Sequence, residues 1–390
     1  MASSSMSNNT SASNAETAKK GVIVIAGGGT GGHIYPGVAI ARAVERLHPD
    51  LEVHFVGAQG GLEEKIIPRE KFPLHTVPVG KLHHSVGLFT RIKTVLKLPL
   101  AFFAAISILR KLKPVAVLGV GGFASGPMLF VSSLFGYRSL IWEPNAYPGL
   151  ANRLLARRVD ECLLVFEEAG RHMQARKTTP SGLPVRATMI PAPQEKLADA
   201  PATQPLRVLV FGGSQGARFI NNLVADTVKA GGFAGVEFVH QTGPYDFERI
   251  KQVYSEAQDA SNVKVFEYLH DMDQRYQWAD LVVCRAGAST VAEICACQKA
   301  AIFIPLPTAA DDHQRKNAEV LARADAALLF QQKELTPEKF RQAILRFRDD
   351  RTAIRRMEEK VRTFQFPNAA EKIVERLLAK NSEQTSSQES

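Results

Sequence analysis

A glycine-rich run near the amino terminus has the residue types of an anion-binding turn. Residues 27–33 read Gly-Gly-Gly-Thr-Gly-Gly-His and lie between a hydrophobic strand pattern and a helical pattern over residues 37–47. Backbone N–H groups at such a turn, together with the helix dipole, bind phosphate or an oxyanion. A tight strand-to-helix turn without a ligand is the alternative interpretation.

The histidine that ends this run is a candidate general base. His33 lies where the expected helix begins, and the positive end of the helix dipole disfavours the imidazolium and lowers the pKa. A neutral imidazole can accept a proton near pH 7. A histidine that merely hydrogen-bonds the loop explains the sequence equally well.

The same run only partly fits a dinucleotide-binding fingerprint. Gly27, Gly29 and Gly32 satisfy the G-x-G-x-x-G spacing, but the acidic ribose ligand expected about 20 residues further on is missing. The second expected strand instead ends in Val-Gly-Ala at residues 56–58. This difference disfavours an NAD-dependent oxidoreductase.

Two parallel-sheet domains would position these residues. Apolar strand patterns alternate with helical patterns, as in βαβ units. The expected strands are 22–25, 53–56, 115–120, 140–142 and 162–165 in the first half and 208–211, 238–240, 263–266, 281–283 and 302–304 in the second. Each half opens with a strand that runs into a glycine-rich turn, at residues 27–32 and 212–216. The predicted fold class is α/β, with two Rossmann-like, doubly wound parallel-sheet domains facing a cleft.

The expected domain boundaries follow from composition. The polar residues 1–20 and 381–390 cannot support burial and are expected to be disordered tails. Residues 21–185 make the first domain and residues 186–350 the second. Helices over residues 351–380 end the fold, and their return to the first domain is one option.

Cysteine and charge content narrow the functional classes. Four cysteines, without a secretory signal pattern, are expected to be buried thiols rather than disulfides. The 390 residues carry a formal charge of +9, and residues 71–142 contain nine basic side chains and no acidic one. No base-reading motif accompanies this charge, so we expect no nucleic-acid partner.

Three motifs, in this order, carry a resemblance to one enzyme family. They are Gly-Gly-Thr-Gly-Gly-His at residues 28–33, Gly-Gly-Ser-Gln-Gly-Ala at 212–217 and Arg-Ala-Gly-Ala-Ser-Thr-Val-Ala-Glu at 285–293. Together they resemble the UDP-N-acetylglucosamine:undecaprenyl-pyrophosphoryl-N-acetylmuramoyl-pentapeptide N-acetylglucosaminyltransferase family, of the GT-B type. The resemblance spans roughly residues 21–371.

The resemblance implies an inverting transfer of N-acetylglucosamine from UDP-N-acetylglucosamine to the undecaprenyl-linked muramoyl-pentapeptide, converting lipid I to lipid II in peptidoglycan synthesis. It implies one in-line displacement without a cofactor or metal. Asp271-Met272-Asp273 matches the D-x-D pattern of metal-dependent transferases, but we interpret it as a solvated helix start. A UDP-N-acetylglucosamine epimerase or another lipid glycosyltransferase of the same fold is the alternative.

The resemblance also implies a set of donor-binding residues, mainly in the second domain. They are Thr30, Gly31, Gly32, Asn145, Arg186, Ser214, Leu269, Ala288, Ser289, Thr290, Val291, Ala292, Glu293 and Gln314. By family correspondence Ser214 and Arg186 would hold the diphosphate, and the Leu269 backbone would hold the uracil. Glu293 would accept from the ribose hydroxyls, and Gln314 would bind the sugar. Thr290-x-x-Glu293 also matches a capping box, a purely structural alternative.

On the acceptor side, the resemblance implies Gly122, Ser125 and Glu143. A plain turn around Gly122 and a solvated charge at Glu143 are the structural alternatives. Two positions depart from the family pattern: Pro144 replaces a glutamine and Leu183 replaces an asparagine. Leu183 cannot make the side-chain hydrogen bond that the family's asparagine could.

An apolar stretch with basic ends indicates a membrane contact. Residues 98–109 are too few to span a bilayer, which needs about 20. Flanked by Arg91, Lys93 and Lys97 and by Arg110, Lys111 and Lys113, the stretch resembles an element that dips into anionic lipid. We therefore expect a peripheral protein on the cytoplasmic face of the inner membrane. A core helix with solvated basic ends is the alternative.

Overall fold

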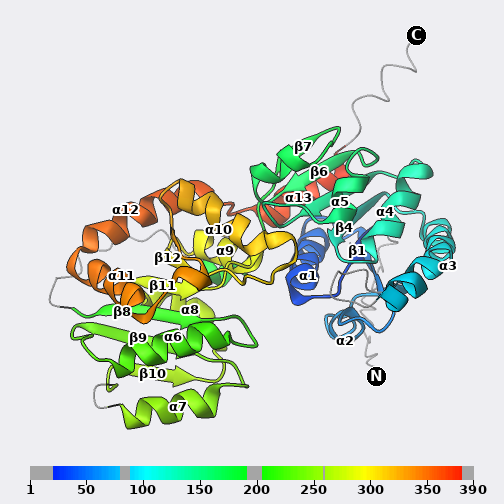
Figure 1. Cartoon of the computed structure of the whole chain (residues 1–390). Coiled ribbons are helices and arrows are strands. Elements are labelled where there is room, and N and C mark those ends of the chain that lie inside the picture. The colour runs from blue at the N-terminus through cyan, green and yellow to red at the C-terminus, as the bar shows by residue number, and fades with distance from the viewer. Residues whose placement is uncertain (1–20, 80–87, 191–203, 258–259, 380–390) are drawn as a thin grey trace, which may run out of the picture.

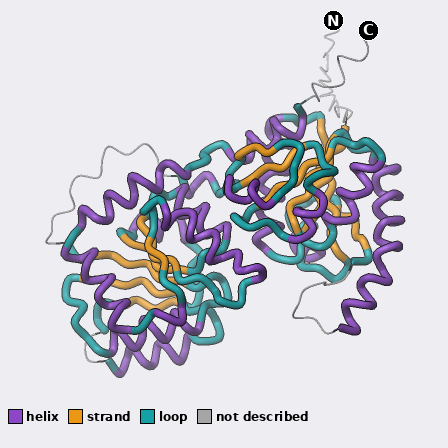
Figure 2. The backbone as a smooth tube through the Cα atoms, turned by 45° about the horizontal axis from the view of Figure 1, so that its top comes forward, coloured by secondary structure: helices purple, strands orange, loops and turns teal. Residues whose placement is uncertain are grey.

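The computed structural model describes residues 21–79, 88–190, 204–257 and 260–379, without the side chains of residues 88–97 and 187. The predicted tails at residues 1–20 and 381–390 lie outside the described residues. Two lobes, each built around a sheet, make up the described chain (Figures 1 and 2).

The first lobe contains a seven-stranded parallel sheet in the order β3-β2-β1-β4-β5-β6-β7. Its strands are β1 (Gly21–Gly27), β2 (Leu51–Ala58), β3 (Leu74–Val77), β4 (Ala116–Gly121), β5 (Ser139–Glu143), β6 (Glu161–Leu164) and β7 (Thr178–Pro180). Its helices are α1 (Gly31–Leu47), α2 (Glu63–Ile66), α3 (Leu88–Leu112), α4 (Ser125–Leu134), α5 (Leu150–Leu155) and the 3-10 helix η1 (Glu167–His172).

The second lobe contains a six-stranded parallel sheet in the order β10-β9-β8-β11-β12-β13. Its strands are β8 (Leu206–Phe211), β9 (Val236–Gln241), β10 (Val263–Phe266), β11 (Leu281–Cys284), β12 (Ala300–Phe303) and β13 (Leu328–Leu329). Its helices are α6 (Arg218–Lys229), α7 (Phe247–Glu256), α8 (Met272–Trp278), α9 (Ala288–Ala296), α10 (His313–Arg323), α11 (Pro337–Asp349) and α12 (Arg351–Val361). The remaining 3-10 helices are η2 (Ala187–Met189), η3 (Ala310–Asp312), η4 (Gln332–Glu334) and η5 (Arg362–Phe364).

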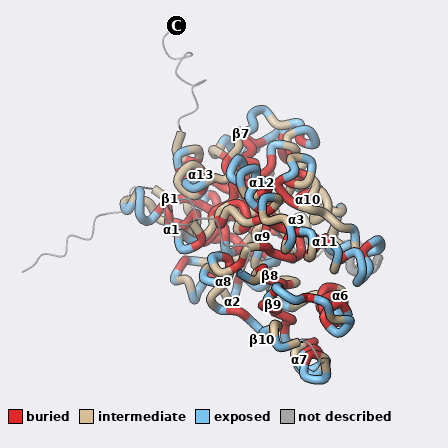
Figure 3. The backbone as a smooth tube through the Cα atoms, turned by 90° about the vertical axis from the view of Figure 1, so that its left-hand side faces the viewer, coloured by how far each residue is buried: buried red, intermediate tan, exposed pale blue. Residues whose placement is uncertain are grey.

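Alternate strand residues point to opposite faces of a sheet, so each sheet has two apolar faces, and helices cover both of them. Ile23 and Ile25 face the cluster with α1, whereas Val24 and Ala26 face the cluster with α3 and α4. The central strand β1 is therefore apolar along its whole length, as in buried parallel sheets. Buried segments gather inside both lobes and exposed segments line the outside (Figure 3).

The predicted fold class is confirmed, and all ten expected strands are present. Three further strands, β3, β7 and β13, were not predicted. Each lies at or near a sheet edge and has only two to four residues, so its hydrophobic pattern is weak. All four cysteines are free and buried, as expected.

The carboxyl-terminal helices divide between the lobes. Helices α11 and α12 pack on the second sheet, whereas α13 (Ala369–Leu378) lies beside α1 in the first lobe (Figure 1). Ile373, Val374 and Leu377 on α13 are buried in the first lobe's core. The chain thus crosses back before its end.

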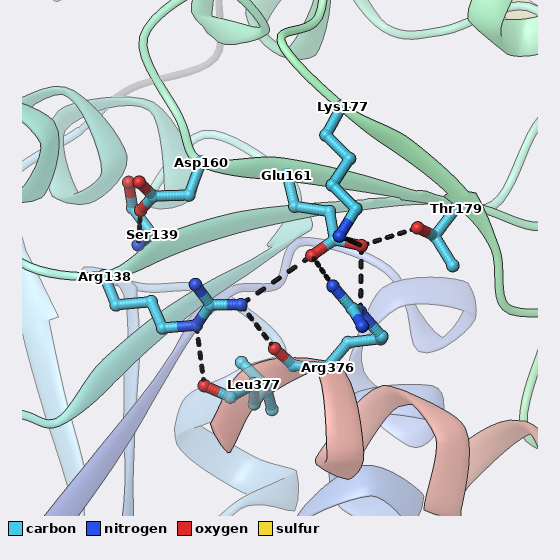
Figure 4. A network of polar contacts seen from close by, with 8 residues as sticks. All are labelled: Arg138, Ser139, Asp160, Glu161, Lys177, Thr179, Arg376 and Leu377. Atoms are coloured by element: carbon cyan, nitrogen blue, oxygen red, sulfur yellow. Dashed lines mark hydrogen bonds and ion pairs between the residues drawn. The ribbon is translucent and has the colours of Figure 1, made fainter. Parts of the chain in front are cut away.

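A buried ion-pair network fastens α13 to the first sheet (Figure 4). Arg376 donates to both carboxylate oxygens of Glu161 on β6, at 2.9 and 2.8 Å. Arg138 donates to the carbonyls of Arg376 and Leu377 at the end of the helix, at 2.7 and 3.0 Å. A cation there satisfies carbonyls that have no intrahelical partner.

Helix α3 has both a core face and an exposed face. Ala101, Ala105 and Leu109 are buried, whereas Leu100 and Phe103 are 58% and 69% exposed. The buried face agrees with the core-helix alternative for residues 98–109, and the membrane contact stays a prediction for the exposed face. The side chains of Arg91, Lys93 and Lys97 lie outside the described residues. Among the described residues, no helix has the length and apolarity needed to cross a membrane.

Candidate functional site

The predicted site residues follow the carboxyl ends of strands in both sheets. In the first sheet the order reverses between the adjacent strands β1 and β4, and in the second between β8 and β11. Ligands bind at such switch points in open α/β sheets, because the loops diverge there. The glycine-rich turns 27–32 and 212–216 and the motif 285–293 therefore all lie at switch points.

The first glycine-rich turn uses part of its hydrogen-bonding capacity internally. The Gly28 N–H donates to the carbonyl of Gly121 at 3.1 Å, and the Gly29 N–H donates to the Glu63 carboxylate at 2.9 Å. These two N–H groups are not available to a phosphate. The expectation that the whole run 27–33 binds an anion through its backbone is therefore wrong for Gly28 and Gly29. Helix α1 begins at Gly31, six residues earlier than expected. The N–H groups of Gly31 and Gly32 belong to its first turn, where no carbonyl four residues back accepts them.

His33 lies in the first turn of α1, half-buried, against the β4 loop. Its Nδ1 is 3.2 Å from the Gly28 carbonyl and 3.5 Å from the Thr30 hydroxyl. Because a carbonyl only accepts, Nδ1 carries the proton in the first contact and Nε2 keeps a lone pair. Burial lowers the pKa of His33 and so does His313 of the second lobe, while the Gly28 carbonyl and Glu63 raise it; the net shift is downward. The expected direction is confirmed, with burial as the first cause.

The loop after β4 packs directly on the first glycine-rich turn. A Cβ on Gly122 would lie 2.4 Å from the Gly28 carbonyl oxygen, so only glycine fits there. The Ser125 hydroxyl is buried and donates to the Gly122 carbonyl at 2.8 Å. Ser125 therefore holds the loop together instead of facing the cleft.

Glu143 organises the loop after β5 and is not a solvated charge. It is 1% exposed, and its oxygens accept from the N–H groups of Asn145 and Gly149 and from the side chains of Asn145 and Asn152. Burial raises the pKa of Glu143, and these hydrogen bonds oppose the rise. The carboxylate thus fixes Asn145, the neighbouring candidate ligand.

The second glycine-rich turn has an exposed serine on a tightly fitted backbone. Gly216 has a φ of +76°, and a Cβ there would lie 1.8 Å from the Thr242 carbonyl oxygen. Gln241 donates to the Gly213 carbonyl at 3.0 Å and accepts from the Leu269 N–H at 3.1 Å. The Leu269 N–H is therefore occupied internally, and its carbonyl is the group left for a base. Ser214 is exposed at the tip.

Helix α9 presents the first turn of the third motif. It begins at Ala288 with Gly287 as the N-cap, so Ala288, Ser289 and Thr290 supply its free N–H groups. The capping-box interpretation is wrong, because Thr290 lies inside the helix and does not cap it. The side chain of Val291 is buried in the core.

Glu293 lies one turn further along α9 and is half-buried. It accepts from the Tyr276 hydroxyl at 3.0 Å. Burial raises its pKa, while the Tyr276 hydrogen bond and the charge of Arg186 lower it; the net shift is upward. Arg186 is exposed in the connection between the lobes. Its positive charge acts on Glu293, the residue predicted to bind the ribose.

The side chains of Gln314 and Asp271 each have a defined hydrogen-bond or ion-pair partner. The Gln314 side-chain oxygen accepts from the Leu306 N–H at 3.0 Å, which leaves its NH₂ group as a donor. Asp271 is the residue before α8 and pairs with Arg275 at 2.8 Å, which confirms a helix start.

The sequence does not predict two residues that contact the candidate site. Glu63 lies under the first glycine-rich turn, and the glycines clustered around it in the sequence were the available indication. Asn317 of α10 is fully buried and bonds Asn145 and Ala146 across the two lobes. No local pattern reveals Asn317, because its partners are 171 and 172 residues away.

Comparison with known proteins gives consistent relatives over nearly the whole chain. The Glycosyltransferase family 28 N-terminal domain matches residues 23–164, and the family 28 C-terminal domain matches residues 207–373. The chain is 45% identical over 364 residues to a UDP-N-acetylglucosamine–N-acetylmuramyl-(pentapeptide) pyrophosphoryl-undecaprenol N-acetylglucosamine transferase of Bdellovibrio bacteriovorus, covering 93% of this chain and 99% of that protein. It is 41% identical over 355 residues to a protein of the same name from Myxococcus xanthus, covering 90% and 91%.

Solved structures show the same architecture. The crystal structure of Acinetobacter baumannii MurG matches with a TM-score of 0.77 and 29% identity, covering 92% of this chain and 99% of that one. A UDP-N-acetylglucosamine 2-epimerase structure matches with a TM-score of 0.60 and 13% identity, covering 92% and 96%. At that identity the second likeness concerns the fold alone.

Proposed function

Because the chain belongs to the family of UDP-N-acetylglucosamine–N-acetylmuramyl-(pentapeptide) pyrophosphoryl-undecaprenol N-acetylglucosamine transferases, we propose that it transfers N-acetylglucosamine from UDP-N-acetylglucosamine to undecaprenyl-pyrophosphoryl-N-acetylmuramoyl-pentapeptide. The observation that carries this proposal is 45% identity to a named transferase over 99% of that protein's length. The product of the step is lipid II of peptidoglycan synthesis. In this proposal the second lobe binds the donor and the first lobe, with α13, binds the acceptor.

The donor would lie over the second sheet, with its diphosphate near the first turn of α9. The free N–H groups of Ala288, Ser289 and Thr290 and the charge of Arg186 suit a group that becomes more negative as it leaves. Glu293, one turn further along α9, would accept from the ribose hydroxyls. The NH₂ of Gln314 would donate to the sugar.

His33 would act as the general base. The acceptor hydroxyl oxygen attacks the anomeric carbon as the bond from that carbon to the UDP oxygen breaks, so the configuration inverts. The hydroxyl proton moves to Nε2 of His33, which then releases it to solvent. The lowered pKa supports this role, because the ring is neutral at pH 7 before the step.

A membrane-facing surface would lie on the first lobe, around α3 and the end of α4. Leu100, Phe103, Leu134 and Phe135 are exposed apolar side chains there, and Arg110 lies 5.7 Å from the centre of the Phe135 ring. Apolar side chains beside cations suit an anionic lipid surface. We place the enzyme peripherally on the cytoplasmic face of the inner membrane, where its lipid-linked acceptor lies.

The decisive experiment mixes the protein with radiolabelled UDP-N-acetylglucosamine and a shortened-chain muramoyl-pentapeptide lipid acceptor in the presence of EDTA. The label is then measured in the organic phase. Label that enters the organic phase only with acceptor establishes the transfer. Intact donor left in the aqueous phase would contradict the acceptor assignment. Free sugar released without lipid would indicate an epimerase instead.

A further inference from the structure

Glu63 is a buried carboxylate directly beneath the first glycine-rich turn. It begins the short helix α2 and is 1% exposed. Its Oε1 accepts from the Ala58 N–H at 2.7 Å and its Oε2 from the Gly29 N–H at 2.9 Å. Among the described residues, no Lys, Arg or His forms an ion pair with it. A charge buried this deeply is costly unless its environment is built for it.

Three glycines shape that environment around the Glu63 side chain. A Cβ on Gly28, Gly57 or Gly61 would lie 2.4, 2.3 or 2.4 Å from Glu63 side-chain atoms. With the Glu63 side chain in this position, only glycine fits at these three places, so the backbone closes directly on the carboxylate. The position of Glu63 is therefore fixed from β1, β2 and the loop before α2.

The peptide unit between Gly28 and Gly29 joins Glu63 to His33. Its N–H, from Gly29, donates to Glu63, and its carbonyl, from Gly28, accepts from Nδ1 of His33 at 3.2 Å. In a trans peptide the N–H and C=O groups point in opposite directions within one plane. Holding the N–H on one side therefore aims the carbonyl at the histidine on the other.

We propose that Glu63 is a positioning residue for the transfer reaction, acting through the Gly28–Gly29 peptide to fix the ring orientation and tautomer of His33. The proton stays on Nδ1, and Nε2 lies beside Gly121, where a Cβ would be 3.0 Å from it. The arrangement resembles a carboxylate–histidine pair with one peptide group inserted between its members. This inference rests on the proposed role of His33 as the base.

The charged groups around His33 set the expected pH effect of removing Glu63. Glu63 raises the pKa of His33, whereas His313 from α10 lowers it. Replacing Glu63 by a neutral residue thus removes the one carboxylate that acts on the ring and lowers the pKa further. The acidic limb of the kcat–pH profile should therefore move to lower pH.

The test compares Glu63→Gln with Glu64→Gln in the full-length protein. Glu64 is the next residue of α2 and accepts the Gly60 N–H at 3.0 Å on the exposed side, so it is a matched control. We expect Glu63→Gln to lower kcat by about 10- to 100-fold, because a small misplacement of a reacting group has effects of this size. The KM for UDP-N-acetylglucosamine should stay within about twofold, because most of the proposed donor contacts come from the second lobe, and Glu64→Gln should match wild type.

A purely structural role would lower the melting temperature without moving the acidic limb, and that result would overturn the proposal. Should Glu63→Gln fail to fold, the ¹⁵N shifts of the His33 ring in the wild-type protein decide the question. An Nδ1–H tautomer supports the proposal, and an Nε2–H tautomer overturns it.

His33→Gln separates the two roles. If His33→Gln abolishes transfer while Glu63→Gln behaves like Glu64→Gln, only the positioning role is overturned. If His33→Gln keeps full activity, both the base assignment and the positioning role are overturned.

Discussion

The side chain of Asn317 bridges the two lobes through Asn145. Its Nδ2 donates to Oδ1 of Asn145 at 3.2 Å and to the Ala286 carbonyl at 3.2 Å, while its Oδ1 accepts from the Ala146 N–H at 2.8 Å. Asn145 is in turn held by Glu143. One buried amide thus connects the acceptor-side loop of the first lobe to α10 and the β11 loop of the second.

Replacing Asn317 by alanine should weaken both stability and the fit of the lobes. The substitution leaves the Ala146 N–H and the Ala286 carbonyl buried without partners, at about 1–3 kcal/mol each. We expect a lower melting temperature and a raised KM for the donor. Asn222→Ala, at an exposed position on α6, is the control and should change neither. Equal melting curves for the two variants would contradict a role for the bridge.

The pH dependence of transfer should report the lowered pKa of His33. The base must be neutral to accept a proton, so a pKa below the ordinary 6.5 extends activity to lower pH. We expect the acidic limb of the kcat–pH profile to have its midpoint below 6.5. His33→Gln should lower kcat by about 100- to 10,000-fold, the contribution of a general base. A midpoint at or above 6.5 would argue against His33 as the titrating group.

Glu293→Gln should weaken donor binding more than it changes the chemical step. The amide keeps an acceptor for the Tyr276 hydroxyl but removes the negative charge that ribose hydroxyls would meet. Hydrogen bonds to charged groups exceed neutral ones by about 1 kcal/mol, so the KM for UDP-N-acetylglucosamine should rise about fivefold. Steady-state kinetics test this, with Glu256→Gln on the exposed end of α7 as control. A large fall in kcat at unchanged KM would exclude a ribose contact.

Arg376→Met should loosen α13 from the first lobe. Leaving a buried charge unpaired costs about 3–5 kcal/mol. The Glu161 side chain is only 2% exposed but keeps Arg138 and Lys177 at 3.7 and 3.8 Å, so we expect a loss below that range. Glu371, on the same helix as Arg376, forms an exposed pair with Arg46 of α1, and Glu371→Gln should cost less than about 1 kcal/mol. Urea unfolding at pH 7 compares the two variants.

The same pair predicts a pH effect on stability. Burial raises the pKa of Glu161, but the hydrogen bonds from Arg376 and Thr179 and nearby positive charge lower it more, so the net pKa is below its ordinary value. A carboxyl with a lowered folded-state pKa stabilises the fold above its unfolded-state pKa and loses that effect as pH falls through the folded-state value. The difference between wild type and Arg376→Met should therefore shrink in acid. A constant difference from pH 7 to pH 3 would contradict this.

Phe103→Asp should reduce binding to anionic liposomes without unfolding the protein. Phe103 is 69% exposed, whereas Phe102 packs against Phe130 with ring centres 5.3 Å apart, so only Phe103 can be changed without disturbing the core. Tyr245→Asp, at an 83% exposed residue of the second lobe, is the control. Co-sedimentation at low and high salt measures the effect. If both variants bind liposomes like the wild type, the proposal that α3 contacts the membrane is wrong.

The sequence by itself determined the two-sheet α/β architecture and the location of the glycine-rich turns. Strand periodicity and glycine clusters are local properties, so Val24, Gly216 and the 285–293 motif could be assigned without knowing their distant neighbours. The family motifs also identified His33, Glu293 and the donor-side turn of α9 as candidates.

Only the tertiary structure decided which polar groups remain free for a ligand. The Gly29 N–H is taken by Glu63, the Leu269 N–H by Gln241, and the Ser125 hydroxyl by Gly122. The Asn317 bridge and the attachment of α13 likewise join residues more than 170 positions apart. A hydrogen bond depends on the positions of both partners in space, and local sequence patterns describe only one of them.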